Sequence, residues 1–240
     1  MSQKTPMNRP PSNTATTTIP YRQIRALYDD TTITVYQAYS PAIASAAVAA
    51  QRLDASPDFR PGRMTWVKPS WAWMMYRAGY SYKDPRQARI LALRMTHAHF
   101  LALLDRGVLS HHHGGGDGGG AGHGGGNDPE SEPAADAADA AAEVRIQWDP
   151  ERTPALDRLP YRSIQIGIPG SLSGRWARDW VVSVEDVTDT ARALKRALDQ
   201  DPGLDLQTLV DRGLVPEERP FPVPDSILTR LDMTRPEPSL

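Results

Sequence analysis

The chain has 240 residues, with 27 cationic and 29 anionic side chains and a formal net charge of −2. This balance argues against a nucleic-acid binder that is basic over its whole surface. There is no cysteine, which excludes disulfides, thiolate nucleophiles and zinc-thiolate sites and fits a reducing compartment. The sequence shows no signal-peptide core and no apolar run of membrane-spanning length, so we expect a cytoplasmic protein without a membrane partner.

Composition divides the chain into a domain and several segments that we expect to lack a fixed structure. Residues 1–20 are rich in Pro, Ser, Thr and Asn and predict a disordered tail. Residues 21–200 predict one domain, interrupted at 111–142 by a disordered insertion with ten glycines, followed by an Ala/Asp tract. Residues 201–240 predict short helices and a proline-rich tail that is only loosely attached.

The first half of the domain reads as two strand-to-helix units. Residues 33–39 are rich in β-branched and aromatic side chains, which predicts a strand, and Ser40-Pro41 then starts an alanine-rich helix. Residues 63–68 predict a second strand, which Pro69 ends. Ser70 caps a short helix that stops at Gly79.

Later segments continue the mixture of periodicities. We expect strands over 88–96, 143–149, 161–168 and 180–186, helices over 96–107 and 186–199, and a short helix or turn over 175–180. The strands and helices do not alternate regularly. The pattern therefore predicts a single α+β domain with a mixed or split sheet of about six strands.

The run from Arg63 to Tyr82 combines three tryptophans, three tyrosines and three methionines with several cations, and this composition is typical of a ligand-pocket wall. Lys68 is the one lysine inside the run, in a chain that otherwise uses arginine almost throughout. Lys68, Ser70 and Arg77 predict an anion-binding edge at a helix N-terminus. The alternative is an exposed Arg77 lying over an aromatic ring, with most of the tryptophan area closing the core.

Four early residues are further candidates for ligand contacts. Arg22 and Arg25 are three apart, which on a helical turn would give a fork for phosphate or carboxylate, or else pairs with the nearby aspartates. Tyr28 and Tyr36 could stack on a base, although tyrosines in strands are more often core residues.

On the late strand, Tyr161, Ser163 and Gln165 share one face, which is either a solvent face or the lining of a cleft. We predict no functional metal. His97 and His99 are two apart and point to different faces of the expected helix, and the remaining clustered histidines lie in the glycine-rich insertion.

Five segments of this sequence resemble the blocks of a bacterial and fungal family described as a domain of unknown function, DUF4291. They are RQIRALYDDTTITVYQAYSPAIASAAV, MTWVKPSWAWMMYRAGY, VRIQWDPER, LPYRSIQIGI and WVVSVEDVT, in this order over roughly residues 20 to 195. The resemblance implies no established activity. It does imply that the glycine- and histidine-rich insertion is not part of a shared site.

The order of elements is also similar to the small split-sheet fold of the ADP-ribosyltransferases. That resemblance implies NAD as a possible ligand, an early contact from Arg22, Arg25 or Tyr36, and Ser70 after the second strand. The late strand carries Gln165 where that superfamily usually places a glutamate.

Three functions therefore remain open. The first is a nucleotide-binding enzyme of ADP-ribosyltransferase-like type, the second a non-catalytic module for a nucleotide or single-stranded nucleic acid, and the third a protein interaction domain.

Overall fold

A computed structural model describes residues 19–110 and 142–234. The predicted tail at 1–20 and the insertion at 111–142 lie almost entirely outside these residues. The strands are β1 Arg25–Ala26, β2 Thr32–Tyr39, β3 Thr65–Val67, β4 Arg89–Thr96, β5 Gly107–Leu109, β6 Val144–Arg152, β7 Arg158–Ile168, β8 Val181–Asp186 and β9 Arg219–Pro220. The helices are α1 Pro41–Ala50, α2 Trp71–Ala78, α3 His97–Asp105, α5 Gly170–Arg175, α6 Thr188–Gln200, α7 Leu206–Asp211 and α8 Asp225–Arg230. Short turns of helix, η1 Leu53–Ala55, η2 Pro85–Gln87 and η3 Trp176–Trp180, complete the set.

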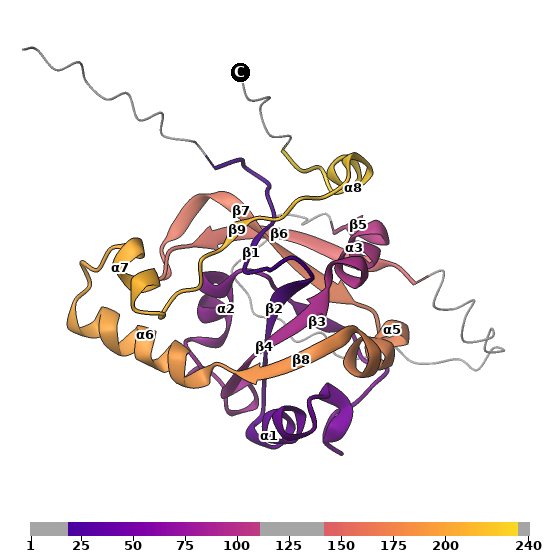
Figure 1. The fold of residues 1–240 in the computed structure, drawn as a ribbon, viewed down its shortest axis with the longest axis horizontal. Helices are drawn as coiled ribbons and strands as arrows, with labels where there is room; N and C mark the ends of the chain where they lie inside the picture. The colour runs from indigo at the N-terminus through magenta and orange to yellow at the C-terminus, as the bar shows by residue number, and fades with distance from the viewer. Residues whose placement is uncertain (1–18, 111–141, 235–240) are drawn as a thin grey trace, which may run out of the picture.

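Seven of the strands form two half-sheets that meet at one point, and β1 and β9 form a separate two-stranded sheet (Figure 1). One half has the order β2-β4-β8 and the other β3-β7-β6-β5. All the pairings are antiparallel except that of β5 with β6. A backbone bridge between Tyr36 and Lys68 joins β2 to the end of β3, with N to O distances of 2.6 and 3.2 Å. The prediction of an α+β domain with a split sheet is confirmed.

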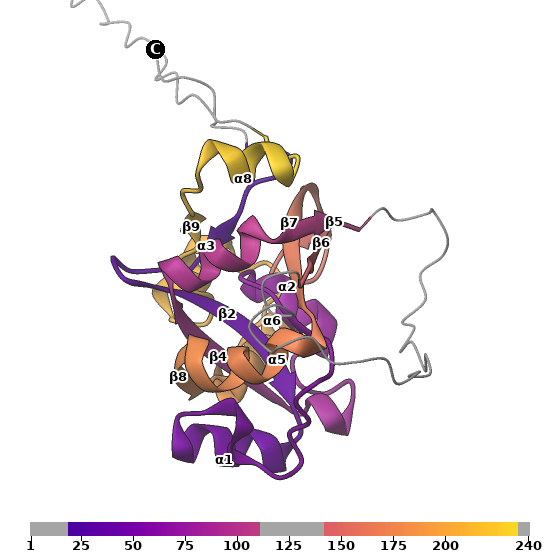
Figure 2. The same ribbon diagram turned by 90° about the vertical axis from the view of Figure 1, so that its right-hand side faces the viewer.

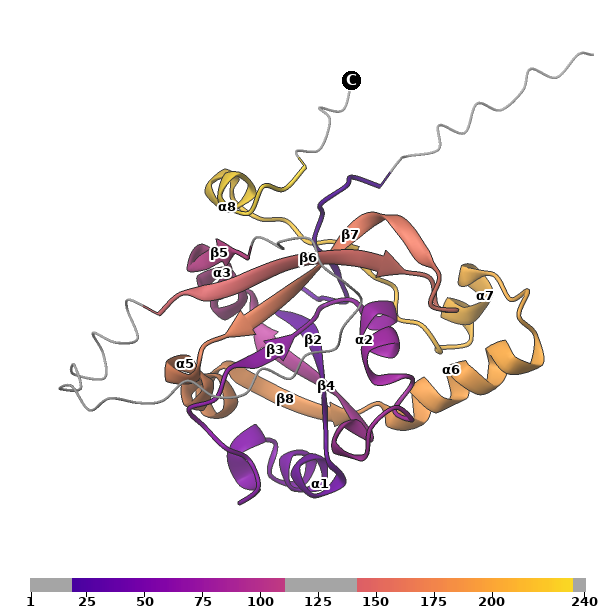
Figure 3. The ribbon, with the colours of Figure 1, turned by 180° about the vertical axis from the view of Figure 1, so that it is seen from behind.

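Because side chains alternate along a strand, each face of this sheet has its own core. The larger core contains Val35, Val67, Leu93 and Ile166 together with residues of α1 and α3. The second core holds Tyr36 and lies under α2 and α6. Figures 2 and 3 show α1 and α2 on different sides of the strands.

The local signals that predicted the helices are satisfied in the structure. Ser70 accepts a hydrogen bond from the N–H of Trp73 at 3.1 Å, as an N-cap does, and α2 ends at Gly79 with φ +55°. Pro41 occupies the first turn of α1.

The C-terminal segment was expected to be a loosely attached tail, yet part of it packs into the larger core. Phe221, Ile227 and Leu231 are at most 5 % exposed. The short strand β9 pairs with β1, and the indole N–H of Trp148 donates to the carbonyl of Leu231 at 3.0 Å. The proline content of this segment led to the expectation of a tail, although its few large apolar side chains are enough to hold it in place.

Two glycines of α5, Gly170 and Gly174, allow a test of how tightly this helix packs against residues 61 and 62. A Cβ at Gly170 would overlap the carbonyl oxygen of Gly62, whereas a Cβ at Gly174 in the same helix would make an ordinary contact with Pro61. We expect Gly170→Ala to lower the free energy of unfolding by about 2 to 4 kcal/mol through overpacking. Gly174→Ala, the matched control, should be neutral or slightly stabilising in urea denaturation. Equal effects of the two substitutions would contradict this packing.

Candidate functional site

Six polar side chains, four of them buried and two half-buried, lie beneath the N-terminus of α2, where the two half-sheets meet. We name this group the α2 polar cluster, and its members are Arg25, Lys68, Ser70, Glu151, Ser163 and Glu218. They come from β1, the ends of β3 and β6, the middle of β7 and the segment before β9. Burial of so many polar groups is costly unless each is satisfied. Their contacts therefore indicate what the cluster is built to do.

Glu151 is the centre of the cluster. One of its oxygens accepts hydrogen bonds from the Ser70 hydroxyl at 2.9 Å and from the N–H of Arg152 at 2.8 Å, and Ser163 donates as well. The pairing of β6 with β7 shifts register between Pro150 and Arg152. Such a bulge redirects the side chain within it, and here it places a carboxylate inside the protein. Burial raises the pKa of Glu151, and the hydrogen bonds only partly oppose this rise.

Glu218 holds the start of α2 from a distant part of the chain. Its carboxylate accepts a hydrogen bond from the N–H of Trp71 at 2.6 Å, and its backbone carbonyl accepts one from Arg25 at 2.8 Å. The side chain is partly buried. Burial, followed by repulsion from Glu151, raises the pKa of Glu218 to about 8. A carboxyl group of the protein itself therefore occupies the α2 N-terminus, and its raised pKa keeps this group largely protonated near neutral pH.

Lys68 is 4 % exposed and lacks an ion-pair partner. Its ammonium lies 4.7 Å from the centre of the Trp73 ring, and no hydrogen bond or ion pair holds it among residues 19–110 and 142–234. Burial and the nearby charge of Arg77 lower the pKa of Lys68 to about 7, against a weaker opposing effect of Asp149. A lysine in this state can bind an anion that neutralises it, or transfer a proton near neutral pH.

A cavity of about 370 Å³ adjoins the cluster, and we call it the aromatic cavity. Tyr36 and Trp71 form part of its wall, with their ring centroids 5.2 Å apart at an edge-to-face angle of 65°. Tyr28 lines it too, and Arg94 and Glu185 bring charges to it. Trp71 connects the two features, because it lines the cavity while its backbone N–H donates to the Glu218 carboxylate.

The structure contradicts the predicted fork of Arg22 and Arg25. Their segment is extended rather than helical, so the two side chains do not share a helical face. Arg22 forms an ion pair with Asp232, and only Arg25 reaches the cluster. The helical reading was wrong because pairing with β9 favoured a strand at a place where spacing alone suggested a turn.

The other predicted site residues differ in whether they lie in the α2 polar cluster, beside the aromatic cavity or outside both. Lys68 and Ser70 lie in the cluster, whereas Arg77 is exposed and donates to Gln87 at 3.2 Å. Tyr36 is buried beside the cavity, and burial raises its pKa. The Tyr28 hydroxyl donates to the carbonyl of Pro220 at 2.8 Å.

The two candidates on β7, Tyr161 and Gln165, also differ in their relation to the α2 polar cluster. Tyr161 lies close enough to Glu151 and Glu218 for both to raise its pKa, after burial as the larger cause. Gln165 donates instead to Gln147 at 2.9 Å. The sequence analysis missed both glutamates. A signal for Glu151 was present, because an acid beside a proline inside an apolar strand suggests a bulge, but no local signal marks Glu218.

The pH dependence of stability tests the state of Lys68. A lysine whose pKa falls on folding weakens the fold as pH drops from its unfolded value of about 10.5 through about 7, since the unfolded chain then binds more protons. Lys68→Met should remove this loss. We expect the variant to be the more stable protein, with an advantage about 2 to 3 kcal/mol greater at pH 6.5 than at pH 9.5 in urea denaturation. A constant difference would show that the lysine keeps its ordinary pKa.

Glu218 should produce the opposite trend. A carboxyl group whose pKa is raised stabilises the fold at low pH, and this stabilisation disappears as pH rises from about 5 to above 8. Glu218→Gln keeps an acceptor for Trp71 without the charge. We expect similar stabilities at pH 5, and at pH 9 an advantage for the variant of about 1 to 2 kcal/mol after solvent screening. Lys68 titrates equally in both proteins and cancels from the comparison, so parallel pH profiles would refute a raised pKa.

Comparison with known proteins identifies the family of this chain but assigns no activity to it. Residues 23–221 match the family model described as Domain of unknown function (DUF4291). No curated protein and no solved structure gave a match. In the described part of the chain, no helix combines the length and apolarity needed to cross a membrane. The match covers the half-sheets, α2 and every member of the α2 polar cluster, so the chain belongs to the DUF4291 family.

Proposed function

We propose that this protein is a nucleotide-binding enzyme of ADP-ribosyltransferase-like type, with the α2 polar cluster and the aromatic cavity as its site. The observation that carries the proposal is Lys68, which is nearly buried and lacks an ion pair, two residues before Ser70, whose hydroxyl donates to the buried Glu151. Apolar side chains at these positions would fold at lower cost. Groups that are expensive to bury and have perturbed pKa values are typical of functional sites.

The strand order supports this class of enzyme. The half-sheets β6-β7-β3 and β2-β4-β8 meet at the end of β3, which is the split arrangement expected from the order of elements. Ser70 follows β3, as the resemblance implies. Gln165 occupies β7, so the carboxylate of the proposed site comes instead from Glu151 on the neighbouring strand. Fold similarity alone assigns no reaction, so the residues of the site must account for the chemistry.

The arrangement suggests how a nucleotide would bind. A planar ring would enter the aromatic cavity and lie against Tyr28, which is only partly buried, next to the buried pair Tyr36 and Trp71. A phosphate would take the place of the Glu218 carboxylate at the N–H of Trp71 and approach Lys68 and Arg25. Its negative charge would raise the pKa of Lys68 again and keep the ammonium protonated.

Glu151 would then serve the transfer step. In the proposed reaction with NAD, the bond between the ribose C1′ and the nicotinamide nitrogen breaks, and its electron pair leaves with nicotinamide. An acceptor oxygen or nitrogen bonds to C1′, and its proton passes to Glu151. The raised pKa of this carboxyl group makes it a better base near neutral pH than an exposed glutamate.

The alternative functions have less support. Trp71 and Trp73 are at most 7 % exposed, so most of the tryptophan block forms core instead of a flat surface for a protein partner. The large apolar side chains that are exposed among the described residues, such as Tyr82 and Val182, come from different elements. A non-catalytic nucleotide module would use the same contacts but would not need a carboxylate with a raised pKa.

Ligand binding by wild type and two variants tests the proposal. We expect NAD to stabilise the protein in thermal-shift screening against ATP and a short oligonucleotide. Lys68→Met should weaken binding measured by calorimetry by about 1 to 3 kcal/mol, the range for a charged hydrogen bond. Glu151→Gln should retain binding and lose the release of nicotinamide.

Each outcome has a separate meaning. Unchanged affinity in Lys68→Met would remove the α2 polar cluster as the binding site. Binding of NAD without release of nicotinamide in any acceptor mixture would favour the non-catalytic module. Lys195→Met, at a half-exposed lysine paired with Asp199, is the matched control and should bind like wild type.

A further inference from the structure

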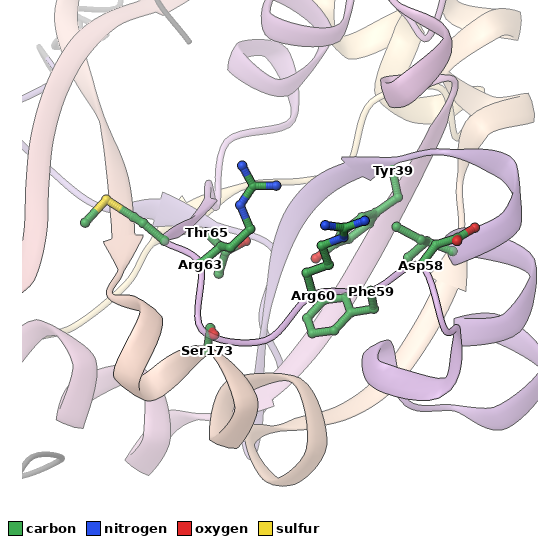
Figure 4. A pocket seen from close by; sticks show the side chains of 9 residues that line it. Tyr39, Asp58, Phe59, Arg60, Arg63, Thr65 and Ser173 are labelled. Carbon is green, nitrogen blue, oxygen red and sulfur yellow. The ribbon is translucent and has the colours of Figure 1, made fainter. Parts of the chain in front are cut away.

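A second cavity, of about 240 Å³, lies on the other face of the sheet (Figure 4). Tyr39 and Thr65 line it, and alternation along β2 and β3 directs these residues away from the side that carries Tyr36 and Lys68. The remaining wall includes Phe59, Arg60 and Arg63 from the loop before β3, and Ser173 from α5. It is therefore separate from the site proposed above.

The loop that carries the two arginines has a fixed shape. Gly62 adopts φ +84°, a conformation that favours glycine, and its N–H donates to the Ser173 hydroxyl at 2.8 Å. Gly170 allows the carbonyl of Gly62 to approach α5 more closely than a side chain would permit. These contacts hold Arg60 and Arg63 at the cavity without using their guanidinium groups.

Both guanidinium groups are available for a ligand. Neither forms a hydrogen bond or an ion pair with another side chain in the part of the chain that the structure describes. Figure 4 shows Arg60 and Arg63 extending from the same loop, with Tyr39 and Phe59 next to Arg60. Asp58 is the one acid in the lining, so the cavity carries a net positive charge.

The floor of the cavity is polar and already internally bonded. The Tyr39 hydroxyl donates to the Gln37 side chain at 2.7 Å, and the amide of Gln37 donates to the hydroxyl of Thr65. The Phe59 ring packs against Tyr39, with centroids 6.4 Å apart. The polar groups of the floor are thus occupied, which leaves the arginines as the groups that select a ligand.

We infer that this cavity binds the diphosphate group of a small molecule, held by Arg60 and Arg63. Arginine recognises phosphate oxygens through paired N–H donors, and two arginines three residues apart on a fixed loop suit two linked phosphate groups better than one. Preorganisation of the loop reduces the ordering cost of binding. The cavity would be a second ligand site on the sheet, whatever the α2 polar cluster binds.

Calorimetry with inorganic pyrophosphate tests this inference on the full chain. Wild type should bind, while Arg60→Gln and Arg63→Gln should each bind about tenfold more weakly or worse, because each loses a charged contact. Arg196→Gln, at an exposed arginine of α6, is the matched control and should bind like wild type. Lys68→Met should lose any binding of pyrophosphate at the α2 polar cluster but keep the binding that Arg60→Gln and Arg63→Gln weaken, which separates the two sites. Wild type and all the variants should bind inorganic phosphate more weakly than pyrophosphate.

Several results would overturn the inference. They are the absence of pyrophosphate binding by wild type, equal affinity in the two arginine variants and the control, and loss of affinity in Lys68→Met alone. The midpoints of thermal unfolding without ligand should agree between wild type and the Arg60→Gln and Arg63→Gln variants, because the two arginines hold no part of the fold. If the unfolding midpoint of an Arg→Gln variant falls, the corresponding Arg→Lys variant provides the test. It keeps the positive charge but loses the paired N–H donors, so it should still bind pyrophosphate more weakly than wild type.

Discussion

The backbone bridge between Tyr36 and Lys68 is the constraint on which the rest of the structure depends. It is the point where β2 and β3 meet, and Pro69 directly afterwards prevents β3 from continuing. The chain must therefore leave the sheet here, and Ser70 starts α2 above the junction. Every group that approaches this junction enters a space that is closed on one side by the sheet and on the other by a helix N-terminus.

This geometry explains why polar groups are concentrated there. The free amides at the start of α2 need acceptors, and Ser70 and Glu218 supply them. Glu151 enters through the bulge next to Pro150 and satisfies the Ser70 hydroxyl in turn. Structural need accounts for this chain of hydrogen bonds. It does not account for Lys68, whose ammonium contacts only an aromatic ring within the described residues, and for this reason the functional argument depends on that side chain.

The two faces of the sheet carry different chemistry because alternation along short strands separates adjacent residues. Lys68 and Val67 are neighbours in sequence, yet one lies in the polar cluster and the other in the larger core. The same rule places Tyr36 beside the aromatic cavity and Tyr39 beside the arginine-lined cavity. The strand β2 thus supplies residues to two cavities that do not share a wall residue.

Much of the fold could be predicted from the sequence, because helices and strands leave a local periodic signal. The six main strands, the cap at Ser70 and the stop at Gly79 were all expected from residues within a few positions of each other. Lys68 and Ser70 were identified as site residues for a similar reason: a proline, a cap and a lysine in an aromatic run are adjacent. The helical turn expected at Arg22 and Arg25 was wrong, since pairing with β9, almost two hundred residues away, overrode local spacing.

The sequence by itself determined the elements, the division of apolar side chains between sheet faces, and the presence of one lysine among the aromatic residues. Only the tertiary structure decided which charges are buried together. Glu218 reaches the Trp71 amide across 147 positions of sequence, and Ser70 meets Glu151 across 81. The pKa of a carboxyl group depends on the solvent and charges that surround it in space. No local pattern encodes that environment, so the acids of the site appear only when the two half-sheets, α2 and the C-terminal segment have packed together.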